Sequence, residues 1–112
     1  MRQLEPALSV LYSNRDRYRN EAERCHGYGP GWETLIDEYM MFSLVFSRMI
    51  TRIFKLSETE SNPKTILEST IAYSAESEDA MKEECLHIDP HTITGAYNLV
   101  RGKLHVQMNR LA

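Results

Sequence analysis

Long apolar runs are absent from this sequence. The longest, from Tyr39 to Phe46, is interrupted by Ser43 and falls far short of the roughly 20 apolar residues that a membrane-spanning helix needs. The first residues also lack the continuous apolar core of a secretory signal peptide. We therefore expect a cytoplasmic protein that does not act in a membrane.

Cysteine is scarce, because the chain has only Cys25 and Cys85. Two cysteines do not make the disulfide framework of a small secreted protein. Neither a C-x-x-C pair nor an H-x₃-H pair is present, so we expect no metal and no other cofactor. One alternative stays open. Cys25 with His26 and Cys85 with His87 end two predicted helices, and an up-down bundle would bring both ends to one pole as a zinc site.

Composition and charge are those of an ordinary globular domain. The chain has 112 residues, of which 42% are hydrophobic and 26% charged; this predicts one domain over residues 1–112. The net charge of −3 weighs against a dedicated nucleic-acid-binding protein.

The spacing of apolar residues predicts helices throughout the chain. Apolar residues recur three and four positions apart, which is the rhythm of helices packed in a bundle, and no segment alternates as a strand would. We predict an all-α fold, a small up-down bundle of about four helices with no sheet. The weakly apolar middle of the third helix leaves open a variant that is split near Ser74–Ser77. The predicted segments run from about residue 3 to 25, from 32 to 56, from 63 to 88 and from 90 to 111.

Local signals fix the predicted helix ends. Three glycines and a proline in His26–Gly31 break the first helix. Asn62–Pro63 and Asp89–Pro90 each combine a capping side chain with a proline at the first helical position. Gly95 and Gly102 lie seven residues apart on the last helix, and close approach of another backbone would explain them.

The second predicted helix is apolar nearly all round at its middle. Met41 and Leu44 fall on its polar side, beside Met40 and Arg48. A helix of this kind is either central in the fold or covered by a partner. We therefore predict a small non-enzymatic protein that acts by protein–protein interaction as a regulator, adaptor, inhibitor or immunity-type protein. It is expected to form a homodimer through Met40, Met41, Leu44 and Arg48.

A DNA-binding regulator is the first alternative. Residues 86–104 resemble the turn and recognition helix of a helix-turn-helix, which implies that His91, Thr92 and Thr94 enter the major groove. Arg101 and Lys103 would add positive charge. The preceding segment, residues 76–84, carries five acids against one lysine. These acids would be repelled by phosphates and would instead neutralise the basic last helix.

A ribonuclease is the second alternative. Arg19 and His26 lie in RNEAERCH, which resembles the R-x₄₋₆-H motif of HEPN ribonucleases, small all-helical dimers. The resemblance implies that Arg19 and His26 bind and cleave RNA across a dimer interface. Arginine can stabilise phosphate charge and histidine can move a proton, so the chemistry suits the residue types.

Overall fold

The computed structural model describes residues 2–111 and is built from helices. No strand occurs within this range, which confirms the predicted all-α class. A short 3-10 turn leads into four α-helices. The elements are η1 (Arg2–Leu4), α1 (Glu5–His26), α2 (Glu33–Ser57), α3 (Pro63–Glu84) and α4 (Pro90–Asn109).

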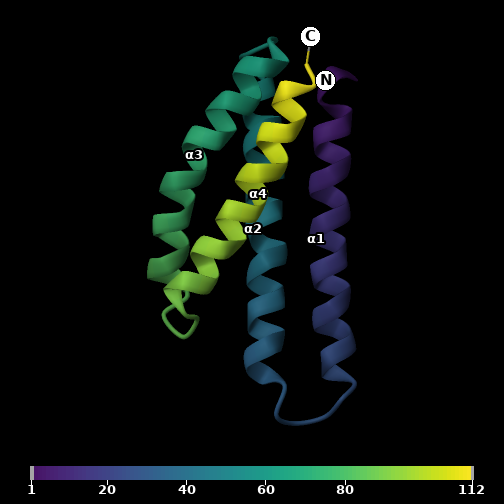
Figure 1. Cartoon of the computed structure of the whole chain (residues 1–112), viewed down its shortest axis with the longest axis vertical. Coiled ribbons are helices and arrows are strands. Elements are labelled where there is room, and N and C mark those ends of the chain that lie inside the picture. The colour runs from purple at the N-terminus through teal and green to yellow at the C-terminus, as the bar shows by residue number, and fades with distance from the viewer. Residues whose placement is uncertain (1, 112) are drawn as a thin grey trace.

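Sequential helices run in opposite directions, so that both chain termini lie at the same end (Figure 1). The helices α2 and α4 pack against each other and against both remaining α-helices. In Figure 1, α1 and α3 lie on opposite sides of this central pair. The arrangement is the predicted up-down bundle of four helices.

The predicted starts of the third and fourth helices and the break after the first helix are confirmed, and each follows from local chemistry. The third helix ends at Glu84, four residues before its predicted end, because Cys85 leaves the helical conformation with φ −109° and ψ 65°. The Asn62 side chain accepts hydrogen bonds from the backbone N–H groups of Lys64 and Thr65, at 3.0 and 3.3 Å. The Asp89 side chain accepts one from His91 N–H at 2.7 Å. Between α1 and α2, Gly29 and Gly31 adopt φ angles of 91° and 99°, a conformation that favours glycine.

The third helix is continuous, so the variant split near Ser74–Ser77 is wrong. Ser74 and Ser77 are buried and face polar groups of α4. Ser77 Oγ lies 2.7 Å from the hydroxyl of the buried Tyr97, and Ser74 Oγ accepts from Arg101 at 3.2 Å. The segment can therefore pack without a strong apolar stripe, because its serines satisfy buried polar partners.

One hydrophobic core joins all four α-helices, and α2 supplies much of it. Met41 is only 3% exposed and belongs to this core, which corrects its predicted place on an outward face. The reason is that α3 and α4 pack on α2 in addition to α1. The buried face of α2 is therefore wider than the face that a single neighbouring helix would cover. The α2 core residues are Met41, Val45, Phe46, Met49, Ile50 and Ile53.

The α1–α2 hairpin extends beyond the α3–α4 hairpin (Figure 1). Its far end has a separate small cluster, formed by Ala22, Cys25 and Ile36. The loop that joins α3 to α4 approaches α2 at Asp37, whose carboxylate lies 3.5 Å from His87 Nε2. The molecule is accordingly elongated, with extents of 48 × 26 × 22 Å.

Gly95 and Gly102 lie at open positions of α4. A Cβ atom added at either glycine would meet nothing within 4 Å, so close approach of a backbone within the chain does not explain them. Both residues interrupt a helix in which glycine costs about 1 kcal/mol relative to alanine.

We expect Gly95→Ala and Gly102→Ala each to raise the free energy of unfolding by about 0.5–1 kcal/mol. Urea denaturation followed by circular dichroism measures this change. A loss of stability in either variant would contradict the open environment of that glycine.

Candidate functional site

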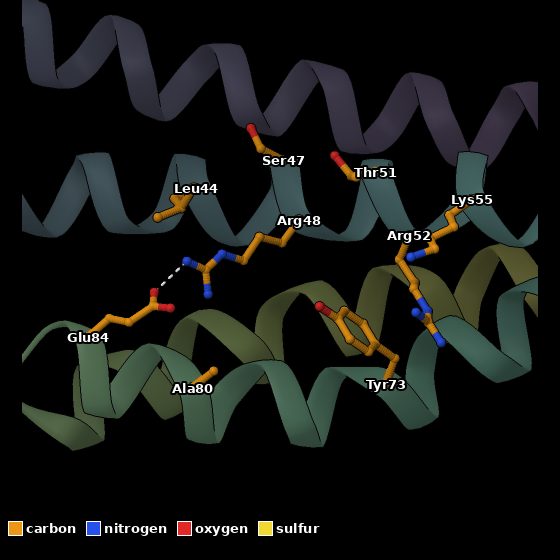
Figure 2. Close-up of a pocket in the computed structure, with 9 residues that line it drawn as sticks. All are labelled: Leu44, Ser47, Arg48, Thr51, Arg52, Lys55, Tyr73, Ala80 and Glu84. Atoms are coloured by element: carbon orange, nitrogen blue, oxygen red, sulfur yellow. Dashed lines mark hydrogen bonds and ion pairs between the residues drawn. The ribbon is translucent and has the colours of Figure 1, made fainter.

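A groove of about 510 Å³ lies between α2 and α3. Figure 2 shows side chains of both helices pointing into it. Its volume falls in the usual range of binding pockets, and both walls are rigid helices. The lining residues are Leu44, Ser47, Arg48, Thr51, Arg52 and Lys55 from α2, and Tyr73, Ala80 and Glu84 from α3.

Arg48 and Glu84 link the two walls. The guanidinium donates to the Glu84 carboxylate at 2.5 Å, as the dashed line in Figure 2 marks. Burial acts to lower the pKa of Arg48, but the hydrogen bond and the charge of Glu84 outweigh burial and raise it. This ion pair therefore keeps Arg48 charged and fixes α2 against the end of α3.

Arg52 is a cation without a carboxylate partner among residues 2–111. Its guanidinium lies 4.5 Å from the centre of the Tyr73 ring, in a cation–π contact. Its Nε atom is buried and makes no hydrogen bond within the described part of the chain. A buried donor without an acceptor is costly, and because Nε is shielded from solvent, a ligand in the groove would reach it only after the Arg52 side chain moved.

The α2 wall is therefore basic. Lys55 is exposed and, like Arg52, has no ion-pair partner in the range 2–111. Among the lining residues, three cations face one carboxylate. The groove is thus positive in a chain whose net charge is −3, and it attracts negative groups.

An apolar stripe on α2 borders the groove. Met40, Leu44 and Phe54 are 47%, 41% and 41% exposed. Together with Ser47 and Thr51 they repeat at spacings of four, three, four and three residues, which places them on one line along the helix. This is the spacing of a helix–helix seam, but no helix among residues 2–111 covers these exposed side chains.

The outer side of α3 is acidic. Glu76 and Glu83 are exposed and lie seven residues apart, next to the groove-lining residues Ala80 and Glu84. The groove consequently separates two surfaces of opposite charge, with cations on α2 and carboxylates on α3.

The predicted interface residues divide between this surface and the core. Met40 and Leu44 are exposed, and Leu44 lines the groove. Arg48 also lines it but is engaged by Glu84. Met41 is buried and cannot contact a partner while the fold is intact. Sequence reasoning missed Arg52 and Tyr73, because the sequence does not reveal that the two stack together between α2 and α3.

Two residues of the DNA-binding alternative already make hydrogen bonds within the chain. Thr94 donates to Glu78 at 2.9 Å, and Arg101 donates to the other oxygen of the same carboxylate at 2.5 Å. The predicted neutralisation of the last helix by the acidic third helix is confirmed at these contacts. His91 is exposed, whereas Thr92 and Lys103 are half-buried.

The zinc alternative is wrong in its geometry. No cluster of three or more histidine, cysteine or acidic residues in the described range could hold a metal ion. Cys25 packs with Ile36 in the small cluster at the hairpin end, whereas Cys85 lies 3.6 Å from the Met81 sulfur. The physical reason is the offset between the two hairpins, which separates the ends of α1 and α3 (Figure 1).

The residues of the ribonuclease alternative lie on the surface of α1. Arg19 and His26 are both exposed and lie seven residues apart, on the same side of the helix. They are about 10 Å apart along the helix axis.

Comparison with protein-family models, curated proteins and solved structures finds no match to this chain. Function therefore has to be argued from the geometry of the chain itself. Among residues 2–111, no helix combines the length and apolar character that crossing a membrane requires.

Glu78 lies on the side of α3 that faces α4, and its pKa is strongly perturbed there. Burial acts to raise its pKa, but hydrogen bonds from Arg101 and Lys82, and one from Thr94, outweigh burial. The pKa falls from its usual 4.5 to about 2. Because the folded chain binds this proton less readily than the unfolded chain, Glu78 stabilises the fold above pH 4.5.

We expect the contribution of Glu78, at most about 3 kcal/mol, to be lost as the pH falls from 4.5 towards 2. Urea denaturation between pH 7 and 2 measures the loss in the native chain and in Glu78→Gln. The variant is expected to be less stable at pH 7 and to depend less on pH in this window. Identical pH profiles would contradict the assignment.

Proposed function

We propose that this protein acts by binding protein, and that its binding surface is the α2–α3 groove with the apolar stripe beside it. The observation that carries the proposal is the exposure of Met40, Leu44 and Phe54 at seam spacing. Apolar residues at the same spacing on the other side of α2 are buried in the core. A partner helix laid along the stripe would bury it in the same way.

The groove offers such a partner both affinity and specificity. Burying the three exposed apolar side chains supplies the hydrophobic term, at roughly 25 cal/mol per Å² of area removed from water. Arg52 and Lys55 then select a partner with negative groups, because cations left without acceptors at an interface lower affinity. Tyr73 and the arginines belong to the residue types that are enriched at interface hot spots.

This surface supports a function in binding rather than in catalysis. Regulators, adaptors, inhibitors and immunity proteins all use helix faces of this kind, and the apolar stripe suits each of these roles equally. We propose that binding takes place in the cytoplasm, in keeping with two free cysteines, Cys25 and Cys85, that form no disulfide.

The double substitution Met40→Asp/Leu44→Asp is expected to abolish binding while leaving the helices intact. Both side chains are exposed, so the change adds charge to the stripe without opening the core. Light scattering of the purified chain and capture of partners from the native host measure binding, and circular dichroism measures helicity. We expect the apparent Kd to rise at least about tenfold.

Val106→Asp is the matched control, because Val106 is a similarly exposed apolar residue (49%) on a different helix, α4. It should leave both mass and capture unchanged. The proposed surface would be rejected if the double variant kept the mass and the captured partners of the native chain. It would also be rejected if Val106→Asp lost them equally.

A further inference from the structure

We infer that one end of the α2–α3 groove is a binding site for a phosphate monoester, that is, for an organic group that carries a dianionic phosphate. The inference rests on the proposed function and deepens it, because it names the negative group that the groove selects. The residues that form this end, which we call the cationic end, are Arg52 and Lys55 of α2 and Tyr73 of α3.

Both cations of the cationic end are available to a ligand. Arg52 and Lys55 have no carboxylate partner among residues 2–111. Glu58 comes one turn after Lys55, and Glu76 lies on the outer side of α3. Neither of these carboxylates lines the groove, and neither pairs with a cation of this end. A negative group in the groove would therefore be their first ionic partner.

The carboxylate that does line the groove is remote from the cationic end. Glu84 comes eleven residues after Tyr73, which is about 16 Å along α3, and it is held by Arg48. Figure 2 shows this ion pair towards one end of the groove, and Arg52, Lys55 and Tyr73 towards the other. Because charges are screened over about 8 Å at physiological ionic strength, Glu84 leaves the positive charge of the cationic end in place.

Stacking on Tyr73 holds the Arg52 guanidinium in position before a ligand arrives. The guanidinium lies 4.5 Å from the ring centre, and its Nε is buried. The arginines that donate hydrogen bonds within residues 2–111 are Arg15, Arg24, Arg48 and Arg101. The Nη atoms of Arg52 are therefore unpaired, and because they are not among the buried unpaired atoms they are open to solvent. Such a stacked guanidinium can donate from both Nη atoms to two oxygens of a phosphate.

Charge and donor number favour a phosphate over a carboxylate. The two unpaired cations together carry a charge of +2. A phosphate monoester, with about −1.5 to −2 at pH 7, neutralises both, whereas a carboxylate would leave one positive charge. The Tyr73 hydroxyl also points into the groove (Figure 2), and it can donate to the third phosphate oxygen. A carboxylate has no third oxygen.

The rest of the groove has room for the organic part of the ligand. Its volume of about 510 Å³ lies in the range of small-molecule pockets. Leu44 and Ala80 line it beyond the cationic end, so an apolar or aromatic group is removed from water there. A phosphorylated side chain of a protein partner and a small phosphate ester share this chemistry.

Phenyl phosphate is the probe, and benzoate, which carries a single negative charge on the same ring, is its comparison. NMR titration of the native chain measures both affinities and identifies the amides whose signals shift. We expect phenyl phosphate to bind at least about tenfold more tightly than benzoate and to bind more weakly as salt is added. The shifts are expected around Arg52, Lys55 and Tyr73. Equal affinities for the two probes, or shifts confined to other parts of the chain, would overturn the inference.

Neutral substitutions test the assigned cations. Arg52→Gln/Lys55→Gln removes both charges and is expected to weaken phenyl phosphate binding at least about tenfold. Lys55→Gln alone changes an exposed side chain, so the fold is retained, and we expect a loss of about threefold, the effect of one exposed ion pair. Circular dichroism checks the helicity of each variant. Unchanged affinity in both variants would reject the site.

Arg17→Gln/Arg19→Gln on α1 is the matched control. Both arginines are exposed, and Arg17, like Arg52, lies over a tyrosine ring, that of Tyr18 at 5.9 Å. The control removes the same net charge and leaves the groove unchanged, so it should bind phenyl phosphate as the native chain does. An equal loss in the control would reduce the effect to net charge and count against the site.

Capture of partners from a dialysed extract of the native host distinguishes the two sources of the phosphate. If phosphatase treatment of the extract abolishes capture, the partner carries the phosphate; if capture is unchanged, the ligand is a free ester. If phenyl phosphate shows no preference while Met40→Asp/Leu44→Asp abolishes capture, the binding surface stands and this inference is wrong. If phenyl phosphate binds as expected while that variant has no effect, the proposed function fails and the site is one for a free ester.

Discussion

The surface of α2 is the constraint on which the rest of the fold depends. This helix packs against α1, α3 and α4 and still leaves Met40, Leu44 and Phe54 exposed. Three neighbours therefore do not cover all of its apolar area. Phe46 of α2 and Tyr97 of α4 are both completely buried, in the core that joins all four α-helices. The groove lies where α3 stands beside the uncovered part of α2.

Polar contacts hold α3 in the position that leaves the groove. Its serines and Glu78 face α4, where they meet Tyr97, Thr94 and Arg101. Its contact with α2 includes the ion pair between Arg48 and Glu84 and the stacking of Arg52 on Tyr73. Because α3 is fixed mainly from the α4 side, Arg52 and Lys55 of the α2 wall have no carboxylate partner within the described range 2–111.

The helices, the starts of α3 and α4 and the break after α1 could be predicted from the sequence, because they depend on local chemistry: apolar spacing, Asn62 and Asp89 as caps, and the glycine-rich turn. The end of α3 at Glu84 was not predicted. The exposure of Leu44 followed from the same helical geometry. Met41 could not be placed, because a helical wheel does not reveal how many neighbours a helix has. Arg52 and Tyr73 come from different helices, and no spacing within the chain indicates that they stack. The zinc alternative failed for a similar reason, since the offset of the two hairpins is a property of packing.

Protection of the α2 stripe in solution tests the central claim most directly. Hydroxyl-radical footprinting of the native chain over a range of concentrations reports the accessibility of individual side chains. If a second copy covers the stripe, Met40 and Leu44 become protected as concentration rises, whereas Val106, which is similarly exposed, and Leu86, which is more exposed, keep their reactivity. Unchanged reactivity of Met40 and Leu44 at concentrations where the chain is dimeric would contradict the account.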